Sequence, residues 1–231
     1  MADEQRHRRL RLLIKKLNKD RKEQAQKIDM LCNDLIGAQR EFIKKLNTIS
    51  FVASFYESIV GTTDLNNLLY TAVRIIKAET DDATVILFLR ESADDLRFAI
   101  FDWRLGLVQQ STIANGQSPA GDALGRKIPL EACFTPELMD GICRSNKVCT
   151  LEDMFAMGLQ GNLTELNKIS AVAIPLGLPG SPLGFMLLYR SSQNKLSADE
   201  IERVSAVTYG LSRAIASCQS FCHKDTKTPR L

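Results

Sequence analysis

Apolar residues recur at alternating spacings of three and four over residues 10 to 56. This spacing places fourteen residues at the two seam positions of a seven-residue repeat, and eleven of the fourteen are apolar. A repeat of this length predicts one continuous helix that buries its apolar stripe against a copy of itself, as in a coiled coil. The residues expected to form the dimer seam are Leu10, Ile14, Leu17, Ile28, Leu31, Leu35, Phe42 and Ile49.

Three of the seam positions are polar, namely Arg21, Gln24 and Lys45. Polar residues at such positions weaken a coiled coil, but they also select its register and its number of strands, so they favour a parallel dimer. The alternative is a long helix that folds back on the globular part of its own chain. The pattern is, however, much longer than the mean globular helix of about 11 to 12 residues.

The heptad pattern breaks near Gly61, which suits a left-handed helix end, and Asp64 suits the start of a second helix. Apolar residues then recur at helical spacing until about Glu79, so one face of this helix should cover a sheet. Two strand-like runs follow at residues 83–90 and 96–105. The polar turn between them predicts a hairpin.

The middle of the chain has weaker patterns. Residues 106–125 are rich in Gly, Ser, Gln and Asn and predict an irregular loop over the sheet. Short strands are expected at 126–130 and 147–151, on either side of a helix of about ten residues that begins near Pro136. A further helix is expected over roughly 154–166.

The last part of the chain has the clearest pattern. Strands at 169–176 and 183–189, separated by a turn rich in Gly and Pro, predict a second hairpin. The stretch from Ser197 to Glu200 has the form of a capping box, which opens a helix that should reach about Cys222. Residues after His223 are expected to form a loose tail.

Charge and cysteine content refine this picture. Residues 1–27 carry a net charge of +6, whereas the whole chain carries +3, so the remainder carries −3. A basic helix of this kind predicts contact with an anionic membrane, a nucleic acid or an acidic protein, and the alternative is a solvated helix face. The six cysteines, without an export signal or a long apolar run, indicate reduced thiols and a cytoplasmic location.

The order of these elements resembles the GAF domain family over residues 46–222. Three stretches carry the resemblance: Asp64 to Ala78 leading into Thr84 to Leu89, Ser170 to Leu176 running through Gly184 to Tyr189, and Leu196 to Ile201. The middle stretch looks like the apolar strand ending in Pro-Leu, with a Gly-led strand after it, that is typical of the family. The resemblance implies an α+β fold, a six-stranded antiparallel sheet flanked by helices, here preceded by the long coiled-coil helix. It divides the chain into a helix at 1–56, a sensor domain at 57–222 and a tail at 223–231.

The resemblance also implies a cavity between one sheet face and residues 106–168, where family members bind cyclic nucleotides, linear tetrapyrroles, haem or small metabolites. Aromatic faces and a few placed polar groups are typical of small-molecule sites. We therefore expect the lining to include Phe101, Trp103, Arg104 and Asp122. Phe101 and Trp103 share one face of an alternating strand, so core packing is the alternative role for both.

The sequence has few of the residues that the known ligands of the family would require. Cyclic-nucleotide binders of one branch of the family carry the motif Asn-Lys-Phe, followed by three residues and then Asp-Glu. In this chain Leu196 stands in place of the Phe, and only two residues separate it from Asp199-Glu200. Ser197 and Glu200 are better explained as a helix start. Haem and bilin are disfavoured because the only histidines, His7 and His223, lie outside the expected cavity. The cofactor is therefore left unassigned.

The cysteines suggest two further kinds of site. Cys218, Cys222 and His223 have zinc-ligand chemistry, but a fourth ligand is missing nearby, and cysteines on an apolar stripe pack as small hydrophobes. Some GAF-like enzymes reduce free methionine sulfoxide with cysteines around the cavity. Cys133, Cys143 and Cys149 fall in the corresponding region, although they do not align with that motif.

Three functions remain as hypotheses. The first is a dimeric sensory protein that binds a small molecule and passes the signal through its flanking helices to a downstream partner. The second is a ligand-free dimeric scaffold that uses the basic helix, and the third is a thiol-dependent methionine sulfoxide reductase. The sequence contains no phosphate-binding Gly-Lys-Ser/Thr loop, no Gly-x-Ser-x-Gly elbow and no His-Glu-x-x-His motif, which favours a regulatory role over an enzymatic one.

Overall fold

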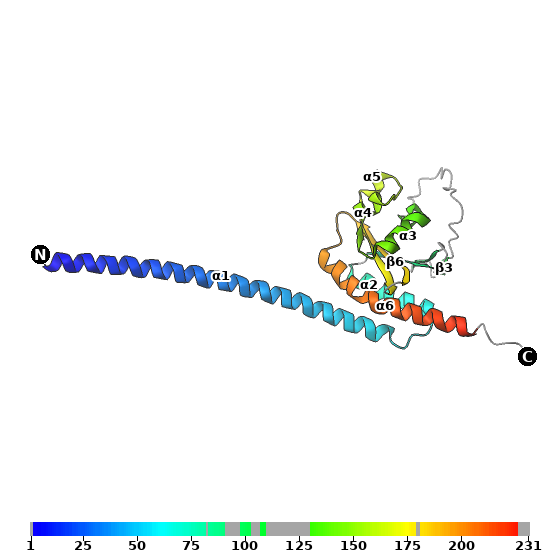
Figure 1. Ribbon diagram of the computed structural model, residues 1–231, viewed down its shortest axis with the longest axis horizontal. Helices are drawn as coiled ribbons and strands as arrows, with labels where there is room; N and C mark the ends of the chain where they lie inside the picture. Colours follow the sequence, from blue (N-terminus) through cyan, green and yellow to red (C-terminus); the bar gives the residue numbers. More distant parts are fainter. Residues whose placement is uncertain are drawn as a thin grey trace, which may run out of the picture. The chain divides into compact units, whose positions relative to one another are not determined.

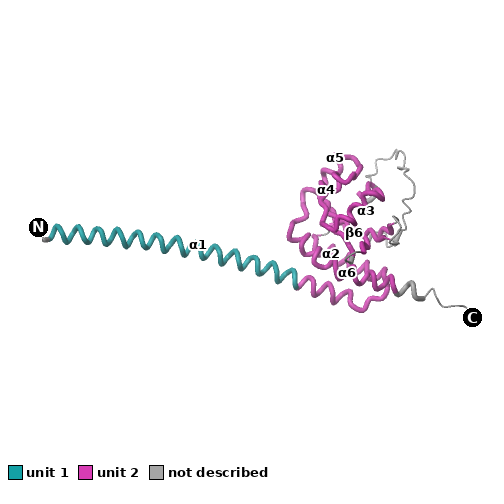
Figure 2. Tube along the Cα trace, in the orientation of Figure 1, with its two compact units in different colours: residues 1–49 teal, residues 50–231 magenta. Residues whose placement is uncertain are grey.

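The computed structural model describes residues 2–81, 83–90, 98–102, 107–109, 130–178 and 181–225. Its contacts divide the chain into two compact units, Met1–Ile49 and Ser50–Leu231 (Figure 2). Helix α1 (Ala2–Ile59) supplies all of the described part of the first unit, and its last turns belong to the second. Within the described part of the chain, no helix is both long and apolar enough to span a bilayer.

The predicted long helix is confirmed, because α1 runs without interruption from Ala2 to Ile59. It ends where the sequence pattern breaks: Gly61 has a φ of +82°, a conformation that residues with a side chain rarely adopt. The carboxylate of Asp64 then accepts a hydrogen bond of 2.8 Å from the backbone N–H of Asn67 and caps the next helix. That helix, α2 (Leu65–Glu79), has the bounds that the sequence predicted.

The strands of the second unit form one sheet in the order β3-β2-β1-β6-β5-β4, and every neighbouring pair in the described residues is antiparallel. The six-stranded antiparallel sheet predicted from the sequence is therefore confirmed. The four inner strands are longer than the two edge strands and form the two predicted hairpins. The strands are β1 (Thr84–Arg90), β2 (Phe98–Asp102), β3 (Leu107–Gln109), β4 (Cys149–Thr150), β5 (Ile169–Leu178) and β6 (Ser181–Ser191).

Helices cover both faces of this sheet (Figure 1). On one face α2, the last turns of α1 and α6 (Ala198–Asp225) pack against alternate residues of the central strands, among them Val85, Leu87 and Leu188. The intervening residues, such as Ile86 and Leu187, point to the other face. That face is covered by η1 (Leu130–Cys133), α3 (Pro136–Ser145), α4 (Leu151–Ala156) and α5 (Leu163–Leu166).

Gly184 is required where the two central strands meet. It pairs with Leu89 across β1 and β6, and its φ of +147° is nearly exclusive to glycine. A Cβ atom at this position would overlap the carbonyl oxygen of Phe88. The glycine that opens the second strand of the predicted hairpin therefore has a steric reason to be there.

The structure corrects several predicted boundaries. The expected loop at 106–125 contains strand β3, and its residues 110–125 lie outside the described part of the chain. The expected strand at 126–130 is not observed at its last residue, because Leu130 begins η1; residues 126–129 are not described. The expected helix at 154–166 is two short helices, α4 and α5, with non-helical residues 157–162 between them.

The C-terminal helix is also longer than expected. It continues past Cys222 and His223 to Asp225, so the start of the expected tail is helical. Residues 226–231 lie outside the described part. The predicted capping box is confirmed: Glu200 accepts from the N–H of Ser197 at 2.7 Å, and Ser197 Oγ accepts from the N–H of Glu200 at 3.3 Å.

Candidate functional site

The face of the sheet covered by α3, α4 and α5 is the one on which the family resemblance places a ligand cavity. Its described residues form an apolar cluster that contains three phenylalanine rings in mutual contact. Phe88 and Phe185 stack with their ring centroids 4.5 Å apart, and Phe134 lies 5.4 Å from Phe88 and 5.7 Å from Phe185. All three rings are at most 2% exposed. Since stacked and offset rings fill space closely, this part of the face is a packed layer of side chains.

An ionic cluster joins the end of strand β1 to helix α3 at the margin of this layer. Arg90 Nη2 lies 3.1 Å from Asp140 Oδ1, and Arg144 Nε lies 2.7 Å from Asp140 Oδ2. The side chains of Arg90 and Asp140 are only 12% and 15% exposed, whereas that of Arg144 is 76% exposed. The Arg90–Asp140 pair therefore acts mainly as a tie between strand and helix.

The Cys143 thiol of this region is buried and is not activated as a nucleophile. Burial raises the pKa of Cys143 to about 12, even though the nearby Arg90 guanidinium acts in the opposite direction. A thiol with such a pKa stays protonated at neutral pH, and the thiolate is the reactive form. Cys149 is buried and its Sγ contacts Ser145 Oγ at 3.3 Å, while Cys133 is half-buried.

Of the three residues considered as zinc ligands, only Cys218 has a described side chain. Cys218 is 2% exposed and belongs to the apolar core between α6 and the sheet, where its Sγ lies 3.6 Å from the carbonyl oxygen of Thr62. The side chains of Cys222 and His223 lie outside the described residues. Among the side chains that are described, no group of three or more His, Cys, Asp or Glu residues is arranged to hold a metal ion.

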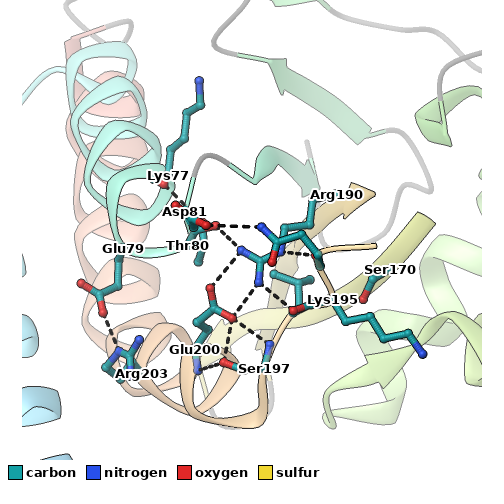
Figure 3. Close-up of polar contacts among 12 residues, drawn as sticks. Lys77, Glu79, Thr80, Asp81, Ser170, Arg190, Lys195, Ser197, Glu200 and Arg203 are labelled. Atoms are coloured by element: carbon teal, nitrogen blue, oxygen red, sulfur yellow. Dashed lines mark hydrogen bonds and ion pairs between the residues drawn. The ribbon is translucent and has the colours of Figure 1, made fainter. Parts of the chain in front are cut away.

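A buried polar cluster around Arg190 links the sheet to two helices (Figure 3). The guanidinium donates to both carboxylate oxygens of Glu200, at 3.0 and 2.9 Å. It also donates to three backbone carbonyls, those of Thr80 at 2.8 Å, Asn194 at 2.6 Å and Lys195 at 2.7 Å. One side chain at the end of β6 thereby holds the C-terminus of α2, the loop after β6 and the first turn of α6.

Glu200 is the acidic partner in this cluster and also part of the helix cap. Burial of the carboxyl opposes ionisation, but hydrogen bonds from Ser197 and the ion pair with Arg190 together outweigh it and lower the pKa of Glu200. This geometry assigns Ser197 and Glu200 to a helix start, the role favoured from the sequence over a cyclic-nucleotide motif. Sequence reasoning did not find Arg190, because nothing local in the sequence pairs a strand-end arginine with a residue ten positions later.

Of the four residues expected to line a ligand cavity, only Phe101 lies in the described part of the chain. Phe101 is 4% exposed and packs with α2 and α6, on the opposite face of the sheet from α3, α4 and α5. Its side chain therefore has the core-packing role and does not line a cavity on the α3–α5 face. Trp103, Arg104 and Asp122 lie outside the described residues.

The expected dimer seam of α1 is solvent-exposed in the single chain. Its eight large apolar residues are between 50% exposed, at Leu10, and 70% exposed, at Leu35. Soluble monomers rarely leave a continuous apolar stripe of this length uncovered, and such stripes mark interaction surfaces. Within α1, surface charges away from the seam form pairs such as Lys19–Glu23 at 3.7 Å, as is common on the outer faces of coiled coils.

The C-terminal turns of α1 are held in the core of the second unit. Phe55 is fully buried and Ile59 is 5% exposed, and both pack with residues of α2 and α6. Tyr56 lies against Gly210 of α6 so closely that a Cβ atom at position 210 would overlap its ring. A glycine inside a helical pattern is a sign of close helix packing, and it was the one clue in the sequence to this contact.

Comparison with known proteins addresses the fold. No family model matches this chain, and no curated protein does either. Among solved structures, the GAF domain of a phosphoenolpyruvate-protein phosphotransferase from Coxiella burnetii is similar over 77% of this chain and 98% of its own, with a TM-score of 0.53 and 12% identity. The GAF domain of such an enzyme from Acinetobacter is similar over 76% and 97%, with a TM-score of 0.50 and 11% identity. Together with the six-stranded sheet and its flanking helices, these similarities show that the chain has the GAF fold that the sequence pattern predicted.

Proposed function

We propose that this chain is a homodimeric regulatory protein, in which two copies of α1 form a parallel coiled coil and the GAF-like domain receives a signal. The observation that carries the proposal is the seam of α1, whose eight large apolar side chains are each at least half exposed in the single chain. Burying an aliphatic side chain of this size contributes about 1.5 to 3 kcal/mol. A second copy of the helix covers the stripe with the same residues, which is the simplest way to gain that energy.

The packing of the domain supports a role in transmission. The last turns of α1 lie in the same core as α2 and α6, through Phe55, Ile59 and the contact of Tyr56 with Gly210. The Arg190 cluster fastens α2 and α6 to the end of a central strand. Because packed helices move in discrete steps and not continuously, a change at the sheet that shifts α6 would change the crossing of α1 as well.

The signal itself is proposed to be a small molecule on the sheet face covered by α3, α4 and α5. Pockets in this position are typical of the fold family that the sequence resembles. The aromatic layer of Phe88, Phe134 and Phe185 leaves the β1–β6 part of that face filled, so a ligand would bind beside this layer. Because this part of the sheet face is filled by side chains, it also supports a second candidate function, a dimeric scaffold that binds no ligand.

Native mass spectrometry of the full chain tests both the proposed dimer and the proposed small-molecule ligand. We expect a dimer mass, and a dimer carrying added mass supports a bound small molecule and begins to identify it. A dimer without added mass favours the scaffold. A monomer at micromolar concentration refutes the coiled-coil proposal.

Two neighbouring residues of α1 provide a matched pair of variants. Leu31 lies on the seam and is 67% exposed, whereas Met30 lies away from the seam and is 66% exposed. Leu31→Asp places a carboxylate from each chain in the dimer interface, so we expect the dissociation constant to rise at least about 100-fold. Met30→Asp adds the same charge outside the interface and should leave the dimer intact. Equal effects of the two variants would place the interface elsewhere.

A further inference from the structure

The charges of α1 are segregated along its length. Residues 5–22, named here the cationic segment, contain nine Lys or Arg and a single Asp, a net charge of +8. Residues 23–49 contain four basic and four acidic residues, a net charge of zero. All residues of the cationic segment are exposed and helical. The two parts of one helix therefore present very different surfaces. Five of the eight seam residues, from Ile28 to Ile49, lie in the neutral part, whereas Leu10, Ile14 and Leu17 lie in the cationic segment.

The cationic segment is also amphipathic. Four of its apolar residues recur at the helical spacing i, i+3, i+4 and i+7 and so share one face of the helix. They are Leu10, Leu13, Ile14 and Leu17, whose exposed fractions lie between 50% and 66%. The opposite face follows the same helical spacing and consists of Arg8, Arg11, Lys15, Lys19 and Lys22. Leu13 and its neighbour Leu12, which is 67% exposed, lie outside the two seam positions, so a two-stranded coil would leave them uncovered.

Electrostatic repulsion weakens a coiled coil in this part of the helix, so the dimer seam is expected to hold from Ile28 to Ile49 and to leave Leu10, Ile14 and Leu17 available to another surface. In a parallel dimer two segments of charge +8 would lie about 8 to 10 Å apart, which is close to the Debye length of about 8 Å at physiological salt. Within each helix, like charges also recur at i and i+4, as for Arg11, Lys15 and Lys19, and such pairs are destabilising. An anionic surface would relieve both kinds of repulsion.

We propose that the cationic segment binds the surface of an anionic lipid membrane, with its helix axis in the plane of the interface. In this position Leu10, Leu13, Ile14 and Leu17 enter the boundary between headgroups and acyl chains, and the Lys and Arg side chains reach lipid phosphates and carboxylates. The apolar face distinguishes this partner from a nucleic acid, which would neutralise the charges but leave four large aliphatic side chains exposed to water. The proposal goes beyond the regulatory dimer and rests on the charge and apolar pattern of the single chain.

Vesicle co-sedimentation of the full chain at physiological ionic strength is the test. We expect binding to phosphatidylcholine vesicles that contain phosphatidylserine and not to vesicles of phosphatidylcholine alone. Substituting Lys15, Lys16, Lys19 and Lys22 by Gln should weaken binding roughly 100-fold or more, because each basic residue near an anionic surface contributes on the order of a fivefold gain in affinity. A matched control removes the same number of charges elsewhere, by substituting Lys27, Arg40, Lys44 and Arg74 by Gln, and should change binding far less.

A second pair of variants tests insertion of the apolar face. Leu13→Asn removes an aliphatic side chain from this face without touching the seam and should weaken vesicle binding about tenfold or more. Met30→Asn makes a similar change outside the cationic segment and should have no effect.

Three results would overturn the proposal: no sedimentation with anionic vesicles, equal losses in the two charge variants, or tighter binding at the same salt to a short DNA duplex than to the vesicles. The oligomer mass is measured on the same samples. Loss of the dimer with retained vesicle binding would refute the regulatory dimer alone, and the reverse result would refute the membrane proposal alone.

Discussion

Replacing Arg190 by Met should strongly destabilise the second unit. The Arg190 side chain is 10% exposed and the Glu200 side chain 11% exposed, so both charges are largely removed from water. The variant keeps the apolar stem of residue 190 but removes two hydrogen bonds to Glu200 and three to backbone carbonyls. The perturbation therefore leaves a buried carboxylate without its counter-ion.

The magnitude follows from this geometry. Removing one partner of a buried ion pair costs about 3 to 5 kcal/mol, because the remaining charge stays desolvated. Glu200 still accepts two hydrogen bonds of 2.7 Å from Ser197, which places the expected loss of unfolding free energy at the lower end, about 3 kcal/mol. The pair formed by Arg203 and Glu79 is a suitable comparison, because its side chains are 23% and 28% exposed. Arg203→Met should cost less, about 1 kcal/mol, because this pair is more exposed to solvent than Arg190 and Glu200.

Urea unfolding of the three proteins, followed by near-UV and far-UV circular dichroism, measures these differences. The two probes are needed because α1 contributes strongly to the far-UV signal, and only near-UV ellipticity reports the packed aromatic side chains of the domain. The double variant Arg190→Met/Glu200→Gln should lose much less than the sum of the single losses, since each single variant strands the other partner. Additive losses, or a loss in Arg190→Met no larger than in Arg203→Met, would refute the buried-pair reasoning.

Three further predictions concern pH and two glycines. The pKa of Glu200 lies below its ordinary value of 4.5, so the ionised carboxylate stabilises the fold fully above about pH 4.5, and this stability is lost as the pH falls through the lower folded-state pKa. The urea midpoint should therefore fall less steeply with decreasing pH in Glu200→Gln than in the parent chain. An unchanged pH profile would contradict this. Gly184→Ala should lower the free energy of unfolding by more than about 4 kcal/mol or prevent folding, because Gly184 has a positive φ and the added Cβ would overlap the carbonyl of Phe88. A native-like melting temperature of this variant would be inconsistent with the close approach of the two strands. Gly210→Ala should destabilise the chain by about 1 to 3 kcal/mol, because the added Cβ overlaps the ring of Tyr56. In a Tyr56→Ala background the same change should stabilise the chain by up to about 1 kcal/mol, because alanine is the better helix former. Thermal unfolding measures both effects, and the same sign in both backgrounds would argue against the contact.

Local signals in the sequence correctly predicted the elements that depend on near neighbours. Asp64 as the N-cap of α2, Gly61 at the preceding helix end and the box of Ser197 with Glu200 all act within one turn of a helix. The helix expected from Pro136 is also confirmed, and Thr135 caps it. Such interactions join residues only a few positions apart, so their chemistry is visible in the order of the residues alone.

Prediction was wrong where competing local preferences had similar strength. Residues 154–166 have a helical pattern of apolar positions, but Gly158 and Gly161 are weak helix formers, and Asn162 begins a new helix by capping α5. Strand β3 was missed because its three residues are too few to show alternation. It exists because the edge of β2 supplies hydrogen bonds to it, with Phe101 paired to Val108.

The sequence by itself determined the long amphipathic helix, the cationic segment, the two hairpins of the sheet and thus the GAF-like order of elements, because periodicity, charge and capping are properties of neighbouring residues. Only the tertiary structure decided which side chains meet across long separations. Arg190 reaches the carbonyl of Thr80, 110 residues earlier in the chain, and Tyr56 meets Gly210. The pairing of β2 with β1 sets Phe101 beside Leu87 and so turns its side chain toward α2 and α6, away from the face where a ligand was expected. These contacts depend on how sheet and helices pack in space, and no spacing along the chain encodes that arrangement.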